Sequence, residues 1–197
     1  MCELCKTQEQ SVNYVEKAEK EMYESRVIYL NEGISSMTVD YLVPLIQKFN
    51  KDDKDIPVKD RQPIQLHINS YGGSAYDGWN IISYMTSSLT PIHTYLYGYA
   101  MSMGLALFVA GDKRHMSKYS TLMYHELSSR LEGTREEMKR AQFEYDRLQD
   151  IYDSFLIDRT KLTLDTLTEH QSKVSDWYID LETALELGLA TDEIATK

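Results

Sequence analysis

The pattern of side chains changes abruptly around residues 98–102, and this change constrains the fold more than any other feature. Residues 91–97 are rich in β-branched and aromatic side chains, which predicts a buried strand, and we expect Gly98 to end it. Residues 103–110 are almost wholly apolar and are followed by Gly111, which predicts a core helix. A buried strand that leads directly into a buried helix indicates an α/β fold.

Ser102 lies at this junction, at or near the start of the predicted helix. The unpaired N–H groups and the positive end of the dipole at a helix N-terminus stabilise a developing oxyanion, so the position suits a nucleophile. A serine here can also be a plain N-cap that hydrogen-bonds those same N–H groups and does no chemistry. This segment alone leaves both interpretations open.

A second unusual segment, residues 66–74, is a hydrophobic strand that ends in the pair Gly72–Gly73. Glycines accept positive φ and let backbone N–H groups face a site with no Cβ in the way, which suits an oxyanion hole or a phosphate cradle. A plain turn is the alternative. Because strand ends in an α/β sheet converge on one crevice, we expect this turn to lie near Ser102.

A serine nucleophile needs a base, normally histidine. The chain has five histidines, at positions 67, 93, 115, 125 and 170. The first two lie in predicted strands, and we expect His115 in a polar turn and His170 in a polar connection. His125 follows a predicted strand over 120–124, which would deliver it to the same edge as Ser102. It is the candidate base, and a hydrogen-bonded histidine at a strand end is the alternative.

The acid that orients this histidine is harder to choose, because carboxylates crowd the last third of the chain. Asp176 is flanked by apolar and aromatic residues that could partly desolvate it. The other nearby carboxylates, Asp150, Asp153 and Asp158, belong to a charged helical segment. Asp176 is therefore the candidate acid.

Four segments resemble, in order, the proteolytic subunit of the Clp protease, a self-compartmentalising serine peptidase: INSYGGS (68–74), GYAMSMG (98–104), MYH (123–125) and SDWYIDLETALELGLA (175–190). The likeness begins near residue 24, so we expect an N-terminal extension over 1–23 and a peptidase domain over 24–197. The resemblance implies a triad of Ser102, His125 and Asp176. It also implies an oxyanion hole formed by the N–H groups of Gly73 and Met103.

The same resemblance implies an α/β fold of repeated strand–strand–helix units, like that of the crotonase-type proteins, with a projecting handle helix. It further implies ATP-independent peptide hydrolysis, and a homo-oligomeric ring, a heptamer or a tetradecamer, that takes peptides or unfolded proteins. A separate AAA+ ATPase would unfold substrates for it. No metal or organic cofactor is expected.

The sequence also departs from the family pattern. Tyr71 replaces the proline before the glycine pair, Glu126–Leu127 replaces Gln-Pro after the histidine, and Ser175 replaces an arginine before the aspartate. Three alternatives therefore stay open. They are a non-catalytic ring subunit, a viral capsid-maturation protease of this type, and an acyl-CoA-handling protein of the crotonase type.

Residues 134–160 predict the handle helix. Thr134 and Glu137 form a capping box. A stripe of apolar residues then recurs at steps of three and four: Met138, Ala141, Tyr145, Leu148, Tyr152 and Phe155. We expect the last four to stay partly exposed in an isolated domain and to be covered by another subunit. Packing of the stripe on its own domain is the alternative.

Composition excludes several classes of protein. A chain of 197 residues with 42% hydrophobic content can form one domain with a sizeable core. A net charge of −10 argues against a nucleic-acid surface, and no apolar stretch is long enough to span a membrane, so we expect a cytoplasmic protein. Cys2 and Cys5 lack a second ligand pair for zinc and are expected to be free thiols. Residues 49–61 predict a solvated surface loop of mixed charge.

Overall fold

The computed structural model describes residues 14, 16–128, 132–173 and 176–195. Cys2, Cys5 and Ser175 lie outside the described residues. The elements are β1 (Val27–Leu30), α2 (Ser36–Asp52), a short 3-10 helix (Val58–Asp60), β2 (Ile64–Ser70), α3 (Ala75–Thr86), β3 (Ile92–Met101), α4 (Met103–Val109), β4 (Lys113–Met116), β5 (Thr121–Tyr124), α5 (Arg135–Arg159), α6 (Leu164–Ser172), β6 (Trp177–Ile179), α7 (Leu181–Glu186) and β7 (Asp192–Glu193).

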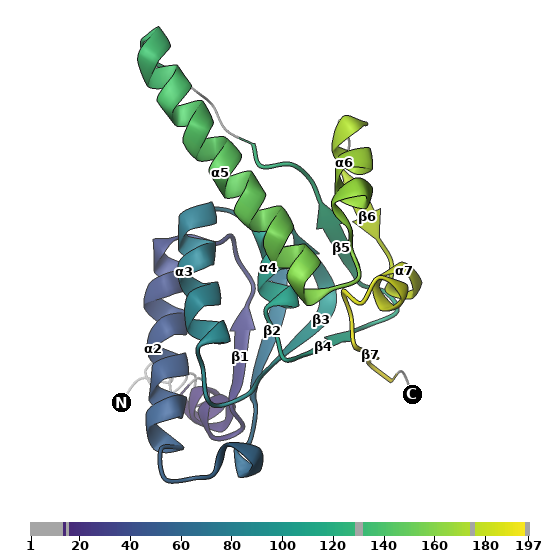
Figure 1. Ribbon diagram of the computed structural model, residues 1–197. Coiled ribbons are helices and arrows are strands. Elements are labelled where there is room, and N and C mark those ends of the chain that lie inside the picture. Colours follow the sequence, from purple (N-terminus) through teal and green to yellow (C-terminus); the bar gives the residue numbers. More distant parts are fainter. Residues whose placement is uncertain (1–13, 15, 129–131, 174–175, 196–197) are drawn as a thin grey trace, which may run out of the picture.

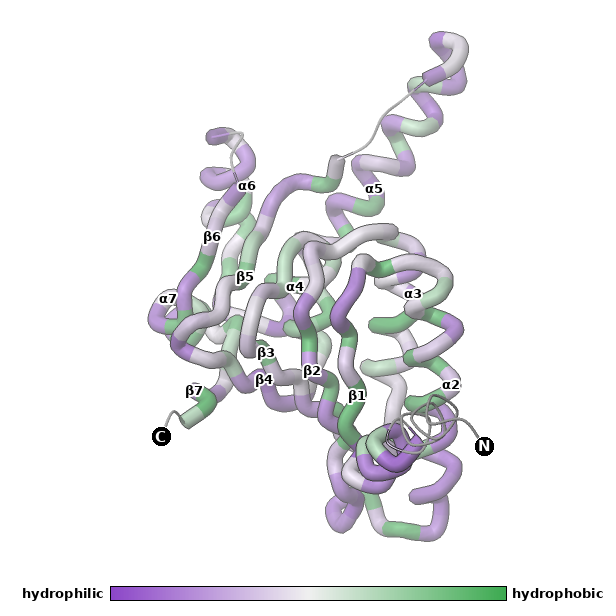
Figure 2. The backbone as a smooth tube through the Cα atoms, turned by 180° about the vertical axis from the view of Figure 1, so that it is seen from behind, coloured by the Kyte–Doolittle hydropathy of each residue, from purple (hydrophilic) through white to green (hydrophobic). Residues whose placement is uncertain are grey.

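The seven strands described form one sheet. Five of them are parallel neighbours in the order β1-β2-β3-β4-β7. The other two lie off this path, since β5 pairs with β3 and β6 pairs with β5. Helices α2, α3 and α4 pack side by side on one face of this sheet (Figure 1). Seen from the opposite side, the strands β1, β2 and β3 lie in front of these helices (Figure 2). Parallel strands joined by helices confirm the predicted α/β fold.

The long strand β3 positions the site, because it pairs with two different neighbours. Its first half lies beside β4 and its end lies beside β5, where Met101 pairs with Met123. The prediction that Gly98 ends the strand was wrong, since β3 runs through Gly98 to Met101. Gly98 instead makes room for Asn69, because a Cβ at position 98 would lie 2.3 Å from the Asn69 side-chain oxygen. The glycine marks an irregularity in the β2–β3 register rather than a break.

The core lies between the sheet and the three helices. Alternate residues of β2 face it, from Ile64 to Ser70, and every residue of α4 is buried. A helix that is apolar on all sides can only be stable when it is surrounded by protein. Helix α4 lies in the core, as predicted. It ends at Val109, one residue earlier than predicted.

Helix α5 is the predicted handle, and it projects from the domain (Figure 1). Thr134 and Glu137 form the predicted capping box. The tip of the helix is exposed, with Phe143 at 73%. At its other end Tyr152 is only 1% exposed, so the expectation that Tyr152 needs a partner subunit to cover it was wrong. Tyr145, Leu148 and Phe155 are partly exposed, as predicted, although Phe155 also packs edge-on to Trp79 of its own domain at 5.3 Å.

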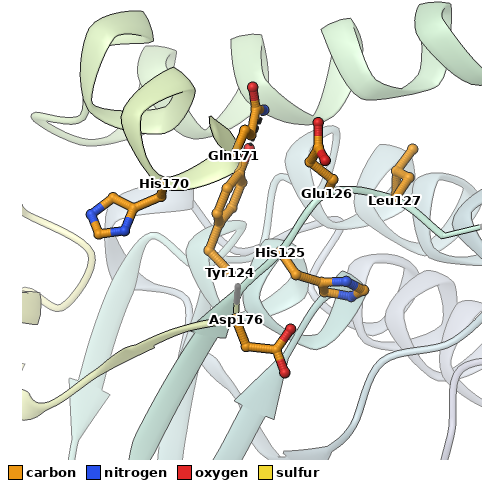
Figure 3. Close-up of a pocket in the computed structure, with 7 residues that line it drawn as sticks. All are labelled: Tyr124, His125, Glu126, Leu127, His170, Gln171 and Asp176. Atoms are coloured by element: carbon orange, nitrogen blue, oxygen red, sulfur yellow. Dashed lines mark hydrogen bonds between the residues drawn. The ribbon is translucent and has the colours of Figure 1, made fainter. Parts of the chain in front are cut away.

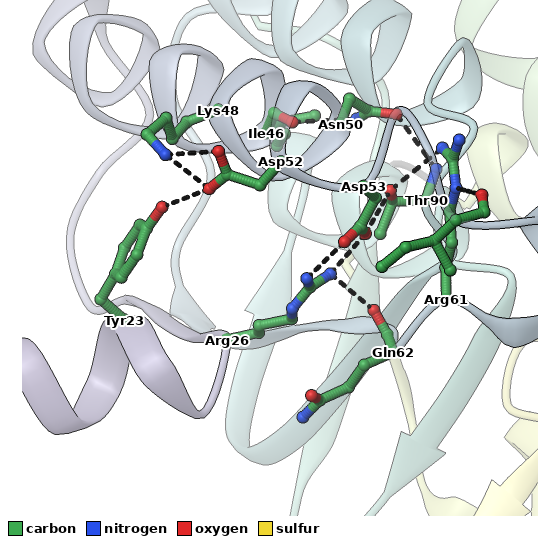
Figure 4. Close-up of polar contacts among 11 residues, drawn as sticks. Tyr23, Arg26, Ile46, Lys48, Asn50, Asp52, Asp53, Arg61, Gln62 and Thr90 are labelled. Atoms are coloured by element: carbon green, nitrogen blue, oxygen red, sulfur yellow. Dashed lines mark hydrogen bonds and ion pairs between the residues drawn. The ribbon is translucent and has the colours of Figure 1, made fainter.

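Residues 49–61 are not the purely solvated loop that their charge predicts. Asp53 is 1% exposed and accepts two hydrogen bonds from Arg26, at 2.6 and 2.5 Å, and one from Thr90 at 2.9 Å (Figure 4). Arg61 reaches the same Thr90 hydroxyl at 3.4 Å. The segment therefore docks on the start of β1 through a buried ion pair, while the neighbouring Lys48–Asp52 pair stays in solvent.

Residues 16–24 are helical, and Tyr23 stacks on Phe49 of α2 at 5.0 Å. The division of the chain at residue 23 stays a prediction. None of the helices described is long and apolar enough to cross a membrane. Within the described ranges, no group of three or more His, Cys, Asp or Glu side chains could hold a metal ion.

Candidate active site

Ser102 occupies the N-cap position of α4, but its side chain does not cap the helix. Its backbone adopts φ 52° and ψ −126°, a conformation that costs a non-glycine residue roughly 1–3 kcal/mol. Two hydrogen bonds hold it there, because its N–H donates to the Met123 carbonyl and its carbonyl accepts from the Tyr152 hydroxyl, both at 2.9 Å. The interpretation of Ser102 as a plain capping serine is therefore excluded.

The Gly72–Gly73 turn lies directly against Ser102. A Cβ at Gly72 would stand 2.8 Å from the Ser102 Cβ and 3.0 Å from the Met103 nitrogen. Ile34 bonds the two residues that flank Gly73, by donating to the Gly72 carbonyl and accepting from the Ser74 N–H, each at 2.9 Å. Gly73 therefore directs its own N–H away from Ile34, as expected at a parallel bridge. Gly72 is required because its backbone lies against Ser102, and Gly73 is required because a Cβ there would lie 2.3 Å from the Ile34 carbonyl oxygen.

Ser102 lines a groove of about 430 Å³ between this turn and α5. One wall comes from Gly73 and Ser74, and the other comes from Tyr145 and Leu148 of α5. Across the groove, the hydroxyl of Tyr76 donates to Glu144 at 2.7 Å. The handle helix therefore forms part of the surface that a molecule bound at Ser102 would contact.

His125 and Asp176 line a second pocket, of about 200 Å³ (Figure 3). Strands β5 and β6 are antiparallel, and Tyr124 pairs with Trp177. His125 follows β5 and Asp176 precedes β6, so the next pair in the same register brings these two residues opposite each other. The antiparallel pairing thus explains how residues about 50 positions apart in the chain share one pocket.

The pocket and the groove adjoin, since Leu127 lines both. Ser102 also lies beside the strand that carries His125, because its N–H is bonded to Met123, two residues before the histidine. Among the described residues, no hydrogen bond joins the side chains of Ser102, His125 and Asp176. The structure brings His125 and Asp176 into one pocket and Ser102 into the adjoining groove.

Comparisons with known proteins show the family of this chain. The model of the Clp protease family matches residues 8–197. The chain belongs to the Clp protease family. It is 31% identical to the ATP-dependent Clp protease proteolytic subunit 1 of Prochlorococcus marinus (strain MIT 9312), over 83% of this chain and 81% of the relative. Subunit 2 of Synechococcus sp. (strain CC9605) is 31% identical over 83% of this chain and 80% of its own length. The proteolytic subunit of Deinococcus radiodurans is 27% identical over 85% and 79%.

The other histidines of this Clp protease chain lie apart from Ser102, and two of their predicted placements were wrong. His115 belongs to strand β4 rather than to a polar turn. His170 belongs to helix α6 and stacks on Trp177 at 3.7 Å, rather than lying in a polar connection. Burial lowers the pKa of His67, His93 and His115, which favours their neutral forms.

The sequence did not point to two residues of the Clp protease handle helix that contact the site from behind. Tyr152 holds the Ser102 carbonyl, and Asp153 bonds to Tyr124, the residue before His125. The sequence pattern places Tyr152 in an apolar stripe and Asp153 in a charged helix, and it indicates no contact of either residue with the site. The available signal was the spacing of Gln149 and Asp153, because residues four positions apart on a helix lie on the same face.

Proposed function

We propose that this chain is a proteolytic subunit that hydrolyses peptide bonds by serine acyl transfer. Ser102 is the nucleophile, His125 is the general base and Asp176 orients the imidazole. The observation that carries the proposal is the uncapped hydroxyl of Ser102, on a strained backbone that lies against the glycine pair and beside the strand of His125. Strain of this kind is typical of functional sites.

The chemistry requires only these side chains and water. His125 takes the proton of the Ser102 hydroxyl as Oγ attacks the peptide carbonyl, and it then gives that proton to the leaving amine. The N–H groups of Gly73 and Met103 stabilise the oxyanion, which the direction of the Gly73 N–H and the place of Met103 at the start of α4 support. Water activated by His125 then cleaves the acyl ester. No step consumes ATP, so short peptides need no ATPase.

The subunit acts within a homo-oligomeric ring, and a separate AAA+ ATPase unfolds protein substrates for it. The relatives are named proteolytic subunits of an ATP-dependent protease, which supports such a partner. The exposed apolar side chains at the tip of α5, Met138 and Phe143, support contact with another subunit.

A second candidate function is that of a non-catalytic subunit of such a ring. It is favoured by the lack of a hydrogen bond among Ser102, His125 and Asp176 in the described part of the chain. Catalytic hydrogen bonds are often long or misaligned without a substrate and tighten when one binds, so this geometry does not decide between the two functions.

Labelling with a fluorophosphonate, followed by mass spectrometry of the tagged peptide, separates the two functions. We expect the tag on Ser102, and we expect Ser102→Ala to abolish both labelling and peptide hydrolysis with its melting temperature preserved. Ser128→Ala removes another exposed hydroxyl of the groove and should keep the label. A wild-type chain that never labels under any assembly condition would establish the non-catalytic function.

The acid is tested by two matched variants. Asp176→Asn should lower kcat by orders of magnitude, about 10⁴-fold where such an acid is fully engaged. Asp180 lies nearby, but it caps helix α7 by accepting from the Thr183 N–H at 2.9 Å, and asparagine caps equally well. Asp180→Asn should therefore leave kcat close to the wild-type value. Equal losses from both variants would remove Asp176 from the triad.

A further inference from the structure

A buried carboxylate lies behind the candidate site, on the handle helix. Asp153 of α5 is 7% exposed. It accepts hydrogen bonds from the Tyr124 hydroxyl at 2.7 Å, from Gln171 Nε2 at 2.9 Å and from Gln149 Nε2 at 2.9 Å. None of the ion pairs among residues that the structure describes involves Asp153. A buried charge compensated only by neutral donors depends on every one of them.

Two of these donors, Tyr124 and Gln171, come from the segments that carry the proposed base and acid. Tyr124 immediately precedes His125, and Gln171 lies near the end of α6, five residues before Asp176. Gln171 Nε2 also donates to the Tyr124 hydroxyl oxygen at 2.6 Å. Figure 3 shows the side chains of Tyr124 and Gln171 directed toward each other on the α6 side of the pocket, with His125 and Asp176 on its other side.

The chain beyond the histidine is anchored to the same carboxylate. Gln149, which donates to Asp153, accepts the backbone N–H of Leu127 at 2.8 Å. The backbone is therefore held on both sides of His125, at Tyr124 and at Leu127. A displacement of Asp153 would move both anchors together.

The protons of this cluster are well defined. Burial and the neighbouring Asp153 carboxylate raise the pKa of Tyr124 far above its ordinary value, so the phenol keeps its proton and donates it. The amide groups of Gln149 and Gln171 can then only donate to the carboxylate. An asparagine at position 153 would place its own N–H₂ group opposite one of the side-chain groups that now donate to the carboxylate.

The nucleophile is tied to the same turn of α5. Tyr152, the residue before Asp153, donates its hydroxyl proton to the Ser102 carbonyl at 2.9 Å. Its ring also stacks on Tyr124 at 5.7 Å. Two consecutive residues of the handle helix thus contact the backbone of the serine and the strand of the histidine.

We propose that Asp153 is a positioning residue for the reaction: its carboxylate, through Tyr124, Gln149 and Gln171, holds His125 and Asp176 in register with Ser102. This inference rests on the proposed function, since it assigns Asp153 a part in aligning that triad. Asp153 itself touches no reacting atom. The alternative is a buried carboxylate that only stabilises the fold, and the two differ in what a mutation does to the chemistry.

The first test is Asp153→Asn in the full-length chain. A positioned general base contributes roughly 10²- to 10⁴-fold, and we expect partial misalignment to lower kcat about 10- to 100-fold. KM should stay within about twofold, because the substrate groove is unchanged. A purely structural role would lower the fraction of active sites without changing the kcat of each site, so the split between kcat and KM tests the positioning role.

A swap variant tests the geometry directly. Asp153→Asn combined with Gln171→Glu moves the carboxylate from α5 to α6, where it can again accept from Tyr124 and from the new amide. We expect this double variant to recover most of the lost kcat. Gln171→Glu alone sets two carboxylates together and should be at least as impaired as Asp153→Asn. Asp150→Asn makes the same change at an exposed position of the same helix and should match the wild type.

Active-site titration with a fluorophosphonate separates the outcomes. If Asp153→Asn lowers the melting temperature and the fraction of labelled sites, but the labelled sites keep the wild-type kcat, Asp153 is only structural and the inference is overturned. If the swap variant recovers stability without recovering kcat, it is overturned as well. Should Asp153→Asn fail to fold, Tyr124→Phe is measured in the same way. Hydrolysis that survives in Ser102→Ala would instead overturn the proposed function.

Discussion

The molecule buries two aspartates and compensates their charges in different ways. Asp53 is held by the guanidinium of Arg26 at the start of β1, far along the chain from the site (Figure 4). Asp153 is held by a phenol and two amides, next to the segment of His125. An ion pair joins two elements by a strong but local bond. Neutral donors are weaker, but here they connect two other elements, β5 and α6, to one carboxylate of α5.

This contrast implies that the two aspartates do different work. Loss of Arg26 leaves the buried Asp53 carboxylate with Thr90 as its remaining hydrogen-bond donor, so the free energy of unfolding falls steeply. Loss of one neutral donor from Asp153 costs less stability, but it releases a segment that carries the proposed base, His125. We therefore expect stability to depend most on the Asp53 pair and kcat to depend most on the Asp153 cluster.

The largest effect on stability should come from Arg26→Met. Removing one partner of a buried pair costs about 3–5 kcal/mol, and we expect a loss of that size in urea unfolding. Lys48→Met removes the cation of the neighbouring exposed pair with Asp52 and should leave the free energy of unfolding nearly unchanged, because solvent screens that pair. At temperatures where it stays folded, Arg26→Met should retain the wild-type kcat. A large drop in kcat under those conditions would break the distinction between the two aspartates.

A smaller effect on stability, but a sharper comparison, comes from removing one hydroxyl donor from each carboxylate. Thr90→Val deletes a donor to Asp53, and Tyr124→Phe deletes a donor to Asp153. Each should cost about 1–3 kcal/mol, because a buried acceptor loses a partner. Only Tyr124→Phe should also lower kcat. Peptidase assays and urea unfolding of the same preparations measure both quantities, and equal kcat values for the two variants would contradict the comparison.

Lowering the pH should weaken the Arg26–Asp53 ion pair, with a smaller loss of unfolding free energy than the substitutions above. The hydrogen bonds from Arg26 lower the pKa of Asp53, so the pair contributes stability above the unfolded pKa of about 3.9 and loses it as the pH falls through the folded value. Arg26→Met removes the largest cause of this lowered pKa, while burial still raises the pKa and Thr90 and Arg61 still lower it. The difference in unfolding free energy between wild type and Arg26→Met should therefore narrow from about pH 5 to about pH 3. A difference that stays constant would mean that Asp53 titrates alike in both proteins.

The parts of the fold that sequence predicts are those with local patterns. The core helix after Ser102, the strand before His125 and the capping box at Thr134 each follow from a few neighbouring residues. The resemblance added the order of Ser102, His125 and Asp176 along the chain. Antiparallel pairing of β5 with β6 then explains how the last two share a pocket.

Sequence could not reveal the buried polar contacts, because they depend on distant elements. Asp53 and Asp153 each lie in charged stretches, where exposure is the ordinary expectation. Their partners Arg26 and Tyr124 lie 27 and 29 residues away. The prediction that Gly98 ends a strand failed for a related reason. The side chain that occupies the space beside Gly98 is that of Asn69, on another strand.

The smallest effect on folding is expected at the exposed tip of the same helix that carries Asp153. Phe143→Glu changes a side chain that is 73% exposed, so the stability of the single subunit should change by no more than about 0.5 kcal/mol. If the tip contacts another subunit in a ring, sedimentation should shift to smaller species, while Phe143→Leu should leave it unchanged. Peptidase activity should fall when assembly is lost, because the buried end of this helix holds Ser102 and Tyr124 through Tyr152 and Asp153. A wild-type chain that sediments as a stable, active monomer would show that these buried contacts align the site without any second subunit.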